Sequence, residues 1–216
     1  MSVPERDKGA RVPVFNSAPL GVVILLAGIV GVYLLGLVFP GFLGWSRSAA
    51  VVFVAGEGGR IPIQPFGPYL PYALHVFIHF GLFHIAMNSA ILVSAGSSVG
   101  KAFGEGVRGV TGFLIFFFAC SIIGAVAHAL IQTGPISAMA GASTGVSGII
   151  AAAGWVRGGY KGMLSLALPW IGINILIGLT DTLVGVPIGW MAHIGGTIAG
   201  AILFPIMLPL FAKREF

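Results

Sequence analysis

Three short stretches of this 216-residue chain gather residue types that carry out nucleophilic and acid-base chemistry. They are HVFIHFGLFHIAMN at residues 75–88, GASTGVSG at 141–148 and AHIGGTIAG at 192–200, which supply histidines and an asparagine, two serines, and one histidine. A serine hydroxyl becomes a nucleophile when an imidazole within about 3 Å removes its proton. Together the stretches hold the parts of a serine-histidine site.

Local positions suggest a role for several of these side chains. His84 and Asn88 are four residues apart, so on a helix they share one face and can both donate hydrogen bonds into one cavity that holds an oxyanion. Ser143 lies where a helix is predicted to begin, and unpaired backbone N–H groups there favour developing negative charge. The Ser143 N–H is then a third donor, and His193 is the candidate general base.

Acidic side chains are absent from all three stretches. The six acidic residues of the chain are Glu5, Asp7, Glu57, Glu105, Asp181 and Glu215. We therefore expect a two-residue arrangement of Ser143 and His193 in uncharged surroundings, with Asp181 as a distant candidate for a third partner.

Composition defines the surroundings of this site. Hydrophobic residues make up 57% and charged residues 8% of the chain, and the mean hydropathy is +1.03. A soluble domain of this length is far less apolar, so the bilayer is the solvent. The net charge of +5 comes from basic residues scattered between apolar runs, which argues against nucleic-acid binding. Cys120 is the single cysteine, which excludes an internal disulfide, and we expect it to be an apolar filler.

Apolar runs predict six membrane-spanning helices and hence an all-α membrane protein. The predicted spans are residues 20–39, 81–99, 111–131, 142–156, 162–180 and 189–210, with a long first loop at 40–80. We expect residues 1–18 to be a short cytoplasmic tail, residues 19–211 to form one six-helix domain and residues 212–216 to be a cytoplasmic C-terminal tail.

Basic residues set the predicted orientation. Alternate loops hold nine of the eleven basic residues on one side, namely Arg6, Lys8, Arg11, Lys101, Arg108, Arg157, Lys161, Lys213 and Arg214. Because Lys and Arg favour the cytoplasmic side, both termini are predicted to be cytoplasmic. The three polar stretches then begin the second, fourth and sixth spans from the opposite face, so they lie at one depth in the membrane.

Small residues predict close packing of the fourth and sixth spans. They are Gly141, Gly145 and Gly148 on the fourth span and Gly196 and Gly200, in a GxxxG pattern, on the sixth. Such faces let helix backbones approach closely in membranes.

The three stretches resemble the motifs of the rhomboid family of intramembrane serine proteases. That family pairs HxxxxHxxxN on one helix with GxSG on a second and AHxxGxxxG on a third, which here read His79–Asn88, Gly141–Thr144 and Ala192–Gly200. The motifs keep the family's order on a six-span layout, so the resemblance covers the chain from about residue 20.

The resemblance implies a rhomboid-like six-helix bundle and a set of site residues. It implies Ser143 as nucleophile, His193 as general base, and His84, Asn88 and the Ser143 N–H as the oxyanion hole. The supporting residues are His79, Gly141, Gly196 and Gly200, and His79 is implied to be structural or to retain water, a role open to His75 as well. No metal, nucleotide or organic cofactor is implied.

Three positions leave alternatives open. Gly145–Gly148 form a second GxSG, so Ser147 is an alternative nucleophile, although Ser143 fits the family pattern without gaps. Thr144 stands where the family usually has glycine, and its β-branched side chain is expected to bring bulk toward the cavity. His128 matches no motif and is interpreted as a packing residue.

The resemblance implies a serine endopeptidase that cleaves transmembrane segments of membrane-protein substrates, and we expect it in a prokaryotic plasma (inner) membrane. The expected partners are transmembrane protein substrates and membrane lipids, with no nucleic acid, and no oligomeric state follows from the sequence. The alternative is a catalytically inactive rhomboid-like protein that binds client proteins, which only Thr144 favours. A transporter would show paired repeats and charges at the bilayer midplane, and the sequence has neither.

Overall fold

Helices dominate the structure, a computed structural model that describes residues 18–53, 65–131, 136–184 and 189–212. Among these residues five helices are long and apolar enough to cross a membrane: α1 (Leu20–Val38), α4 (Leu82–Phe103), α5 (Val107–Ile131), α6 (Ser143–Val184) and α7 (Trp190–Phe211). Helices suit lipid because they satisfy their own backbone hydrogen bonds. The predicted all-α fold class is confirmed. Nearly all of the two predicted tails lies outside the described residues, so the tails stay predictions.

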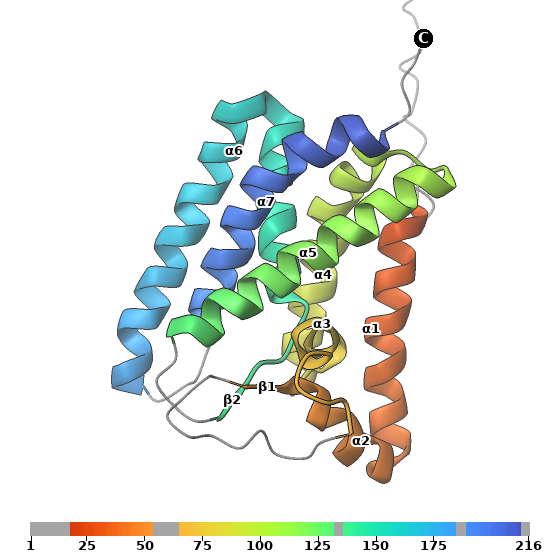
Figure 1. Cartoon of the computed structure of the whole chain (residues 1–216), viewed down its shortest axis with the longest axis vertical. Coiled ribbons are helices and arrows are strands. Elements are labelled where there is room, and N and C mark those ends of the chain that lie inside the picture. The colour runs from red at the N-terminus through yellow and green to blue at the C-terminus, as the bar shows by residue number, and fades with distance from the viewer. Residues whose placement is uncertain (1–17, 54–64, 132–135, 185–188, 213–216) are drawn as a thin grey trace, which may run out of the picture.

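Helix α6 has 42 residues, enough for two membrane crossings, and it folds back on itself. Gly158 has φ −163° and ψ 31°, and Gly159 has φ 57° and ψ −144°, so neither residue is helical. A positive φ is inexpensive only for glycine, which explains why the turn falls here. Figure 1 shows the helix folding back at this point. Four single crossings and this double crossing give the six that the sequence predicted.

The described part of the predicted first loop folds into short elements at one end of the bundle (Figure 1). They are α2 (Pro40–Arg47), η2 (Ser48–Ala50), β1 (Val51–Phe53), α3 (Pro71–Leu74) and η3 (His75–Phe77). Strand β1 pairs antiparallel with β2 (Ile136–Ala138), with Val51 opposite Ala138. The Met139 N–H then donates to Ala50 O at 2.6 Å. This ladder was not predicted from the sequence, because strands of three residues are too short to show alternation.

Helix α7 packs against the first half of α6 with direct backbone contact. A Cβ added at Gly200 would collide with the backbone of Gly148, and a Cβ added at Gly196 would collide with Thr144 O. Lipid supplies no hydrophobic drive between helices, so close van der Waals contact of this kind holds them together. The close approach predicted for Gly148, Gly196 and Gly200 is present.

The same prediction was wrong for two other glycines of the fourth predicted span. Gly145 faces Ser121 and Phe117 of α5, and Gly141 faces His84 of α4. Gly145 lies on another side of the helix, and Gly141 lies before its first turn.

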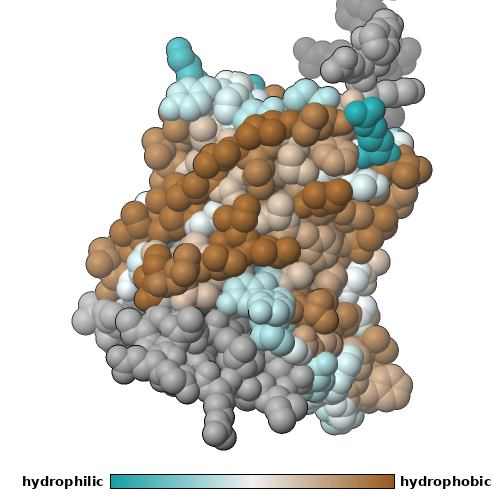
Figure 2. Space-filling view, in the orientation of Figure 1, coloured by the Kyte–Doolittle hydropathy of each residue, from teal (hydrophilic) through white to brown (hydrophobic). Residues whose placement is uncertain are grey.

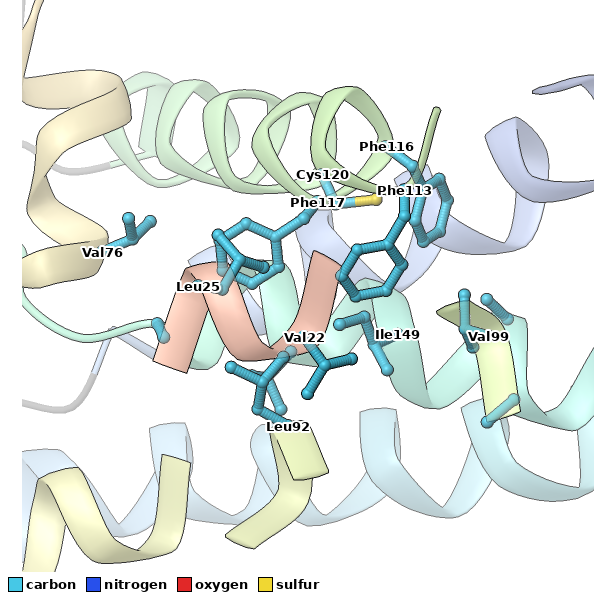
Figure 3. Close-up of a cluster of buried hydrophobic side chains, with 14 of the residues drawn as sticks. Val22, Leu25, Val76, Leu92, Val99, Phe113, Phe116, Phe117, Cys120 and Ile149 are labelled. Carbon is cyan, nitrogen blue, oxygen red and sulfur yellow. The ribbon is translucent and has the colours of Figure 1, made fainter. Parts of the chain in front are cut away.

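An apolar core fills the space between α1, α4, α5 and α6. Figure 3 shows Val22, Leu92, Phe113 and Ile149, one from each of these helices, within one cluster of buried side chains. Cys120 of α5 belongs to the same cluster and is fully buried as a free thiol. It fills apolar space, as predicted.

The outer surface of the bundle is apolar along the length of the helices. Figure 2 shows a broad hydrophobic belt, with hydrophilic residues gathered toward the ends. Large side chains on this surface are strongly exposed, such as Val107 at 87% and Leu130 at 80%. A water-soluble monomer rarely carries an exposed apolar area of this extent, whereas lipid is its natural neighbour. The chain is an integral, multi-pass membrane protein.

Four of the five basic residues in the described part of the chain lie toward one end of the bundle, and the fifth, Arg47, ends α2 at the other end. Lys101 and Arg108 flank the connection from α4 to α5, and Arg157 and Lys161 flank the turn within α6. Figure 1 shows both connections at the end opposite to β1 and β2. This arrangement agrees with the charge pattern from which the orientation was predicted.

We expect Gly200→Ala to lower the melting temperature of the purified protein in detergent. The new methyl group meets the Gly148 backbone, so α7 must move away from α6, at a cost of about 1–3 kcal/mol. Gly31→Ala is the matched control, because a Cβ there meets nothing within 4 Å and alanine favours helix. A Gly200→Ala protein that melts as high as the Gly31→Ala protein would contradict this packing.

Candidate active site

Ser143 is the first residue of α6, and hydrogen bonds from the loop after α3 hold the turn that leads to it. The Gly141 N–H donates to His75 O at 3.0 Å, and the Ala142 N–H lies 3.4 Å from His79 Nε2. Gly141 has φ +105°, a conformation that side chains rarely allow. The chain around His75 and His79 therefore fixes where α6 begins.

Gly141 also makes room for His84. A Cβ at Gly141 would lie 2.5 Å from His84 Nε2 and 3.5 Å from Ser143 Oγ. The imidazole of α4 and the hydroxyl of α6 therefore border the same small volume. The His84 ring in turn lies beside the His79 ring, with 4.9 Å between the ring centroids.

The hydroxyl of Ser143 meets the imidazole of His193. Ser143 Oγ lies 2.7 Å from His193 Nε2, a normal hydrogen-bond distance between a hydroxyl and an imidazole. His193 lies near the N-terminal end of α7, on the helix whose backbone touches α6 through Gly196. This geometry can move a proton from the serine hydroxyl to the imidazole.

The other imidazole nitrogen of His193 also has a partner. Asn174, in the second half of α6, places Oδ1 at 2.7 Å from His193 Nδ1. The Asn174 Nδ2 donates to Trp170 O at 2.8 Å, so both ends of the amide are bonded. The Trp170 ring lies beside the His193 ring, with centroids 6.3 Å apart and planes 33° apart.

Ser147 links the two halves of α6 one turn below Ser143. Its hydroxyl donates to Ser143 O at 2.7 Å and accepts from Trp170 Nε1 at 3.0 Å. The hydrogen bonds thus form a closed circuit through Ser143, His193, Asn174, Trp170 and Ser147, which we call the serine-histidine circuit. Ser147 is fully buried within it.

Asn88 lies on the same helix as His84, one turn further along. Asn88 is 4% exposed, and its Nδ2 donates one hydrogen bond to His84 O at 2.9 Å. An amide nitrogen carries two hydrogens, so this group keeps a second donor. Both predicted donors of α4 therefore come from one turn of helix.

The sequence model of the Rhomboid domain family matches residues 67–210, which include every element of this site. The chain belongs to the rhomboid family. No individual curated protein matches the chain. Membership makes the chain a rhomboid-type intramembrane protease or a homologue of one.

Thr144 departs from the usual rhomboid glycine, and its position corrects an expectation. The side chain was expected to bring bulk toward the cavity, but Thr144 is 2% exposed and its Cγ2 faces Gly124 of α5 and Gly196 of α7. A Cβ at Gly124 would collide with that methyl group. The side chain of Thr144 therefore fills space between the helices. It does not point the same way as Ser143, because successive residues of a helix point about 100° apart.

His75 and His128 are both buried and lie close enough to each other for their charges to interact. His75 is fully buried, and its Nδ1 lies 3.1 Å from Pro71 O. His128 of α5 is 5% exposed and lies near enough to His75 and His193 for a charge on it to act on both. Its burial agrees with the packing role predicted for it.

Asn174 and Trp170 are the site residues that the sequence analysis missed. Asp181 was a distant candidate for a third partner beside the expected two-residue arrangement, and its side chain lies outside the described part of the structure. The residue that faces His193 Nδ1 is Asn174. An asparagine inside the apolar run LPWIGINILIG was the available signal, since such a polar side chain is costly in lipid without a partner.

Metal-binding side chains do not cluster within the residues that the structure describes. No group of three or more His, Cys, Asp or Glu side chains there could hold a metal ion.

Acidification is expected to destabilise this rhomboid. Burial lowers the pKa of His75 to about 4, and burial together with the nearby charge of His84 lowers the pKa of His79 to about 4. Both rings are neutral in the folded state, whereas the unfolded chain binds protons below about pH 6.5. The stabilisation is therefore complete above about pH 6.5 and is lost as the pH falls toward 4.

The measurement is the melting temperature in detergent between pH 7.5 and pH 5. His75→Asn keeps a hydrogen-bond donor near Pro71 O but removes one titrating group, so its melting temperature should fall less steeply. Equal slopes for the two proteins would show that His75 does not carry this dependence.

Proposed function

We propose that this rhomboid is an active intramembrane serine endopeptidase, with Ser143 as nucleophile and His193 as general base. The observation that carries the proposal is the 2.7 Å contact between Ser143 Oγ and His193 Nε2. It lies between two membrane-spanning helices of a chain in the rhomboid family. A serine paired with an imidazole is the minimum arrangement for acyl transfer.

The first half of the reaction forms an acyl-enzyme. Ser143 Oγ attacks the carbonyl carbon of the scissile peptide bond while His193 Nε2 takes the hydroxyl proton. The carbonyl becomes a tetrahedral oxyanion. When it collapses, the C–N bond breaks, His193 returns the proton to the leaving amine, and the acyl group stays on Ser143.

The oxyanion hole is proposed to consist of His84, Asn88 and the Ser143 backbone N–H. His84 Nε2 borders the same volume as Ser143 Oγ, and Asn88 keeps a free amide hydrogen one turn away. The N–H of Ser143 lies at the start of α6, where the helix dipole favours negative charge. These donors act most strongly on the charge that develops in the transition state.

Hydrolysis of the acyl-enzyme repeats the same proton transfers with water. His193 removes a proton from a water molecule, the hydroxide attacks the acyl carbon, and the proton passes to Ser143 Oγ as the acid product leaves. The described residues carry each of these steps without a cofactor.

The substrate is proposed to be a transmembrane segment of another membrane protein. The apolar outer surface gives such a segment a lipid path to the bundle. An intact helix hides its carbonyl groups in hydrogen bonds, so the segment must unwind at the scissile bond. We propose that both termini are cytoplasmic and that the protein lies in a prokaryotic plasma membrane, with the site toward the opposite face.

Ser147 is the weaker candidate for the nucleophile. Its hydroxyl already donates to Ser143 O and accepts from Trp170 Nε1, and the residue is fully buried. Attack by Ser147 would cost the hydrogen bond that its hydroxyl donates to Ser143 O in a buried place. These contacts favour Ser143.

Cleavage of a reporter transmembrane substrate by purified protein in detergent tests the dyad. We expect Ser143→Ala and His193→Ala to abolish cleavage, because each removes one partner of the proton transfer. Ser147→Ala should retain cleavage at a reduced rate, since it loosens the support of Ser143 without removing a reacting atom. Loss of cleavage in Ser147→Ala with retention in Ser143→Ala would reverse the assignment.

If the wild-type protein does not cleave the reporter, labelling of Ser143 serves as a separate control. If several reporters stay intact and a serine-directed fluorophosphonate fails to label Ser143, the chain is an inactive homologue that binds client proteins. The burial of Thr144 between helices weighs against that outcome.

We expect His84→Ala and Asn88→Ala each to lower kcat by about 10²–10³-fold with a much smaller change in KM. Removal of one oxyanion-hole donor has an effect of this size, because the lost bond acts mainly in the transition state. Ser94→Ala is the control on the same helix, since its exposed hydroxyl bonds only to Ile91 O of its own helix. A rise in KM as large as the expected fall in kcat, with kcat itself unchanged, would assign the two residues to substrate binding instead.

A further inference from the structure

Asn174 is an unusual residue to find inside a membrane-spanning helix. It is 1% exposed, and it lies in the second half of α6, within a predicted membrane span. An unbonded amide in such a place costs several kcal/mol relative to water. The cost is avoided because the oxygen meets His193 and the nitrogen meets Trp170.

The contacts of the amide decide its orientation. Trp170 O is a carbonyl and can only accept, so the group that faces it at 2.8 Å is the Nδ2 of Asn174. Oδ1 therefore faces His193 Nδ1 at 2.7 Å, and that nitrogen must carry the hydrogen. Nε2 is then the bare nitrogen, the only state in which it can accept the Ser143 proton.

We infer that Asn174 is a positioning residue that holds His193 in the tautomer needed for catalysis, an inference that rests on the proposed function. It acts through His193 and touches no reacting atom. In a Ser-His-Asp triad a carboxylate does this work, and asparagine does it in papain-like proteases. The site is thus a Ser-His-Asn arrangement and not a dyad alone.

Trp170 and Ser147 hold Asn174 in turn. Trp170 offers its backbone carbonyl to the amide and its indole N–H to Ser147, whose hydroxyl bonds to Ser143 O. Each donor group in the serine-histidine circuit has one acceptor. Each residue donates to the next one, in the same direction around the circuit. The side chain of Asn174 has no second arrangement that satisfies all of these groups.

An uncharged third partner has a chemical consequence. An amide oxygen fixes the tautomer but stabilises the imidazolium less than a carboxylate does. Among the side chains that the structure places, the other titratable groups whose charges act on His193 are His84 from α4 and His128 from α5. Substitution of Asn174 by aspartate therefore places a negative charge directly beside His193 Nδ1.

The first test is kinetic and uses purified protein with a reporter substrate. We expect Asn174→Ala to lower kcat by about 10- to 100-fold with little change in KM, because the misoriented imidazole reaches the hydroxyl less often. Asn174→Asp should recover most of the loss and move the acidic limb of the pH–rate profile to higher pH. Thr180→Ala is the matched control, since this exposed hydroxyl on the same helix bonds only to Leu176 O and Ile177 O.

The second test does not depend on activity. In protein with ¹⁵N-labelled histidine, the His193 signals, assigned by their loss in His193→Gln, should show a protonated Nδ1 and a bare Nε2. Asn174→Ala should give a mixture of tautomers, and Asn174→Asp should restore the single one. Unchanged tautomer and unchanged kcat in a stably folded Asn174→Ala protein would overturn the inference.

The two tests separate this inference from the proposed function. If Ser143→Ala still cleaves the reporter, the proposed nucleophile is wrong, yet the tautomer of His193 still reports on Asn174. If Ser143→Ala is inactive and Asn174→Ala behaves as wild type, only the positioning role fails.

Discussion

The whole site depends on how closely α7 can approach the first half of α6. An imidazole reaches only a few ångströms beyond its backbone, so Ser143 Oγ and His193 Nε2 meet at 2.7 Å only because the two helices touch. Gly196 lies against Thr144 O and Gly200 against the Gly148 backbone, and no larger side chain fits at either glycine. Lipid does not push helices together, so this steric fit carries the geometry.

Polar groups at such a site must be satisfied by one another, because the surrounding lipid offers no hydrogen bonds. The turn at Gly158 and Gly159 brings the second half of α6 back beside the first, and this return supplies Trp170 and Asn174. The serine-histidine circuit is therefore built from one folded helix and a single residue of α7. Its members both orient the imidazole and remove the cost of placing polar side chains in the membrane.

Much of this architecture was predictable from the sequence, and the rest was missed for identifiable reasons. Six apolar runs gave the crossings, and the short motifs around His84, Ser143 and His193 indicated the helices of the site, because both signals are local. Asn174 was missed because its partner is 19 positions away and no periodic pattern links the two. The direction of Thr144 depends on the rotation of α6 against α5, and the β1–β2 ladder depends on pairing between distant short segments. Neither the direction of Thr144 nor the pairing of the two strands can be predicted from a short stretch of sequence.

The position of His193 on α7 also bears on biosynthesis. Ribosomes deliver the chain from its N-terminus, so the helices that carry Ser143 and Asn174 enter the membrane before the helix that carries His193. Until α7 inserts, the serine has no base and the backbone of Gly148 has no helix against it. Under the proposed mechanism the Ser143 hydroxyl of the nascent chain is therefore unreactive toward neighbouring transmembrane segments. It becomes reactive only when α7 has packed against α6.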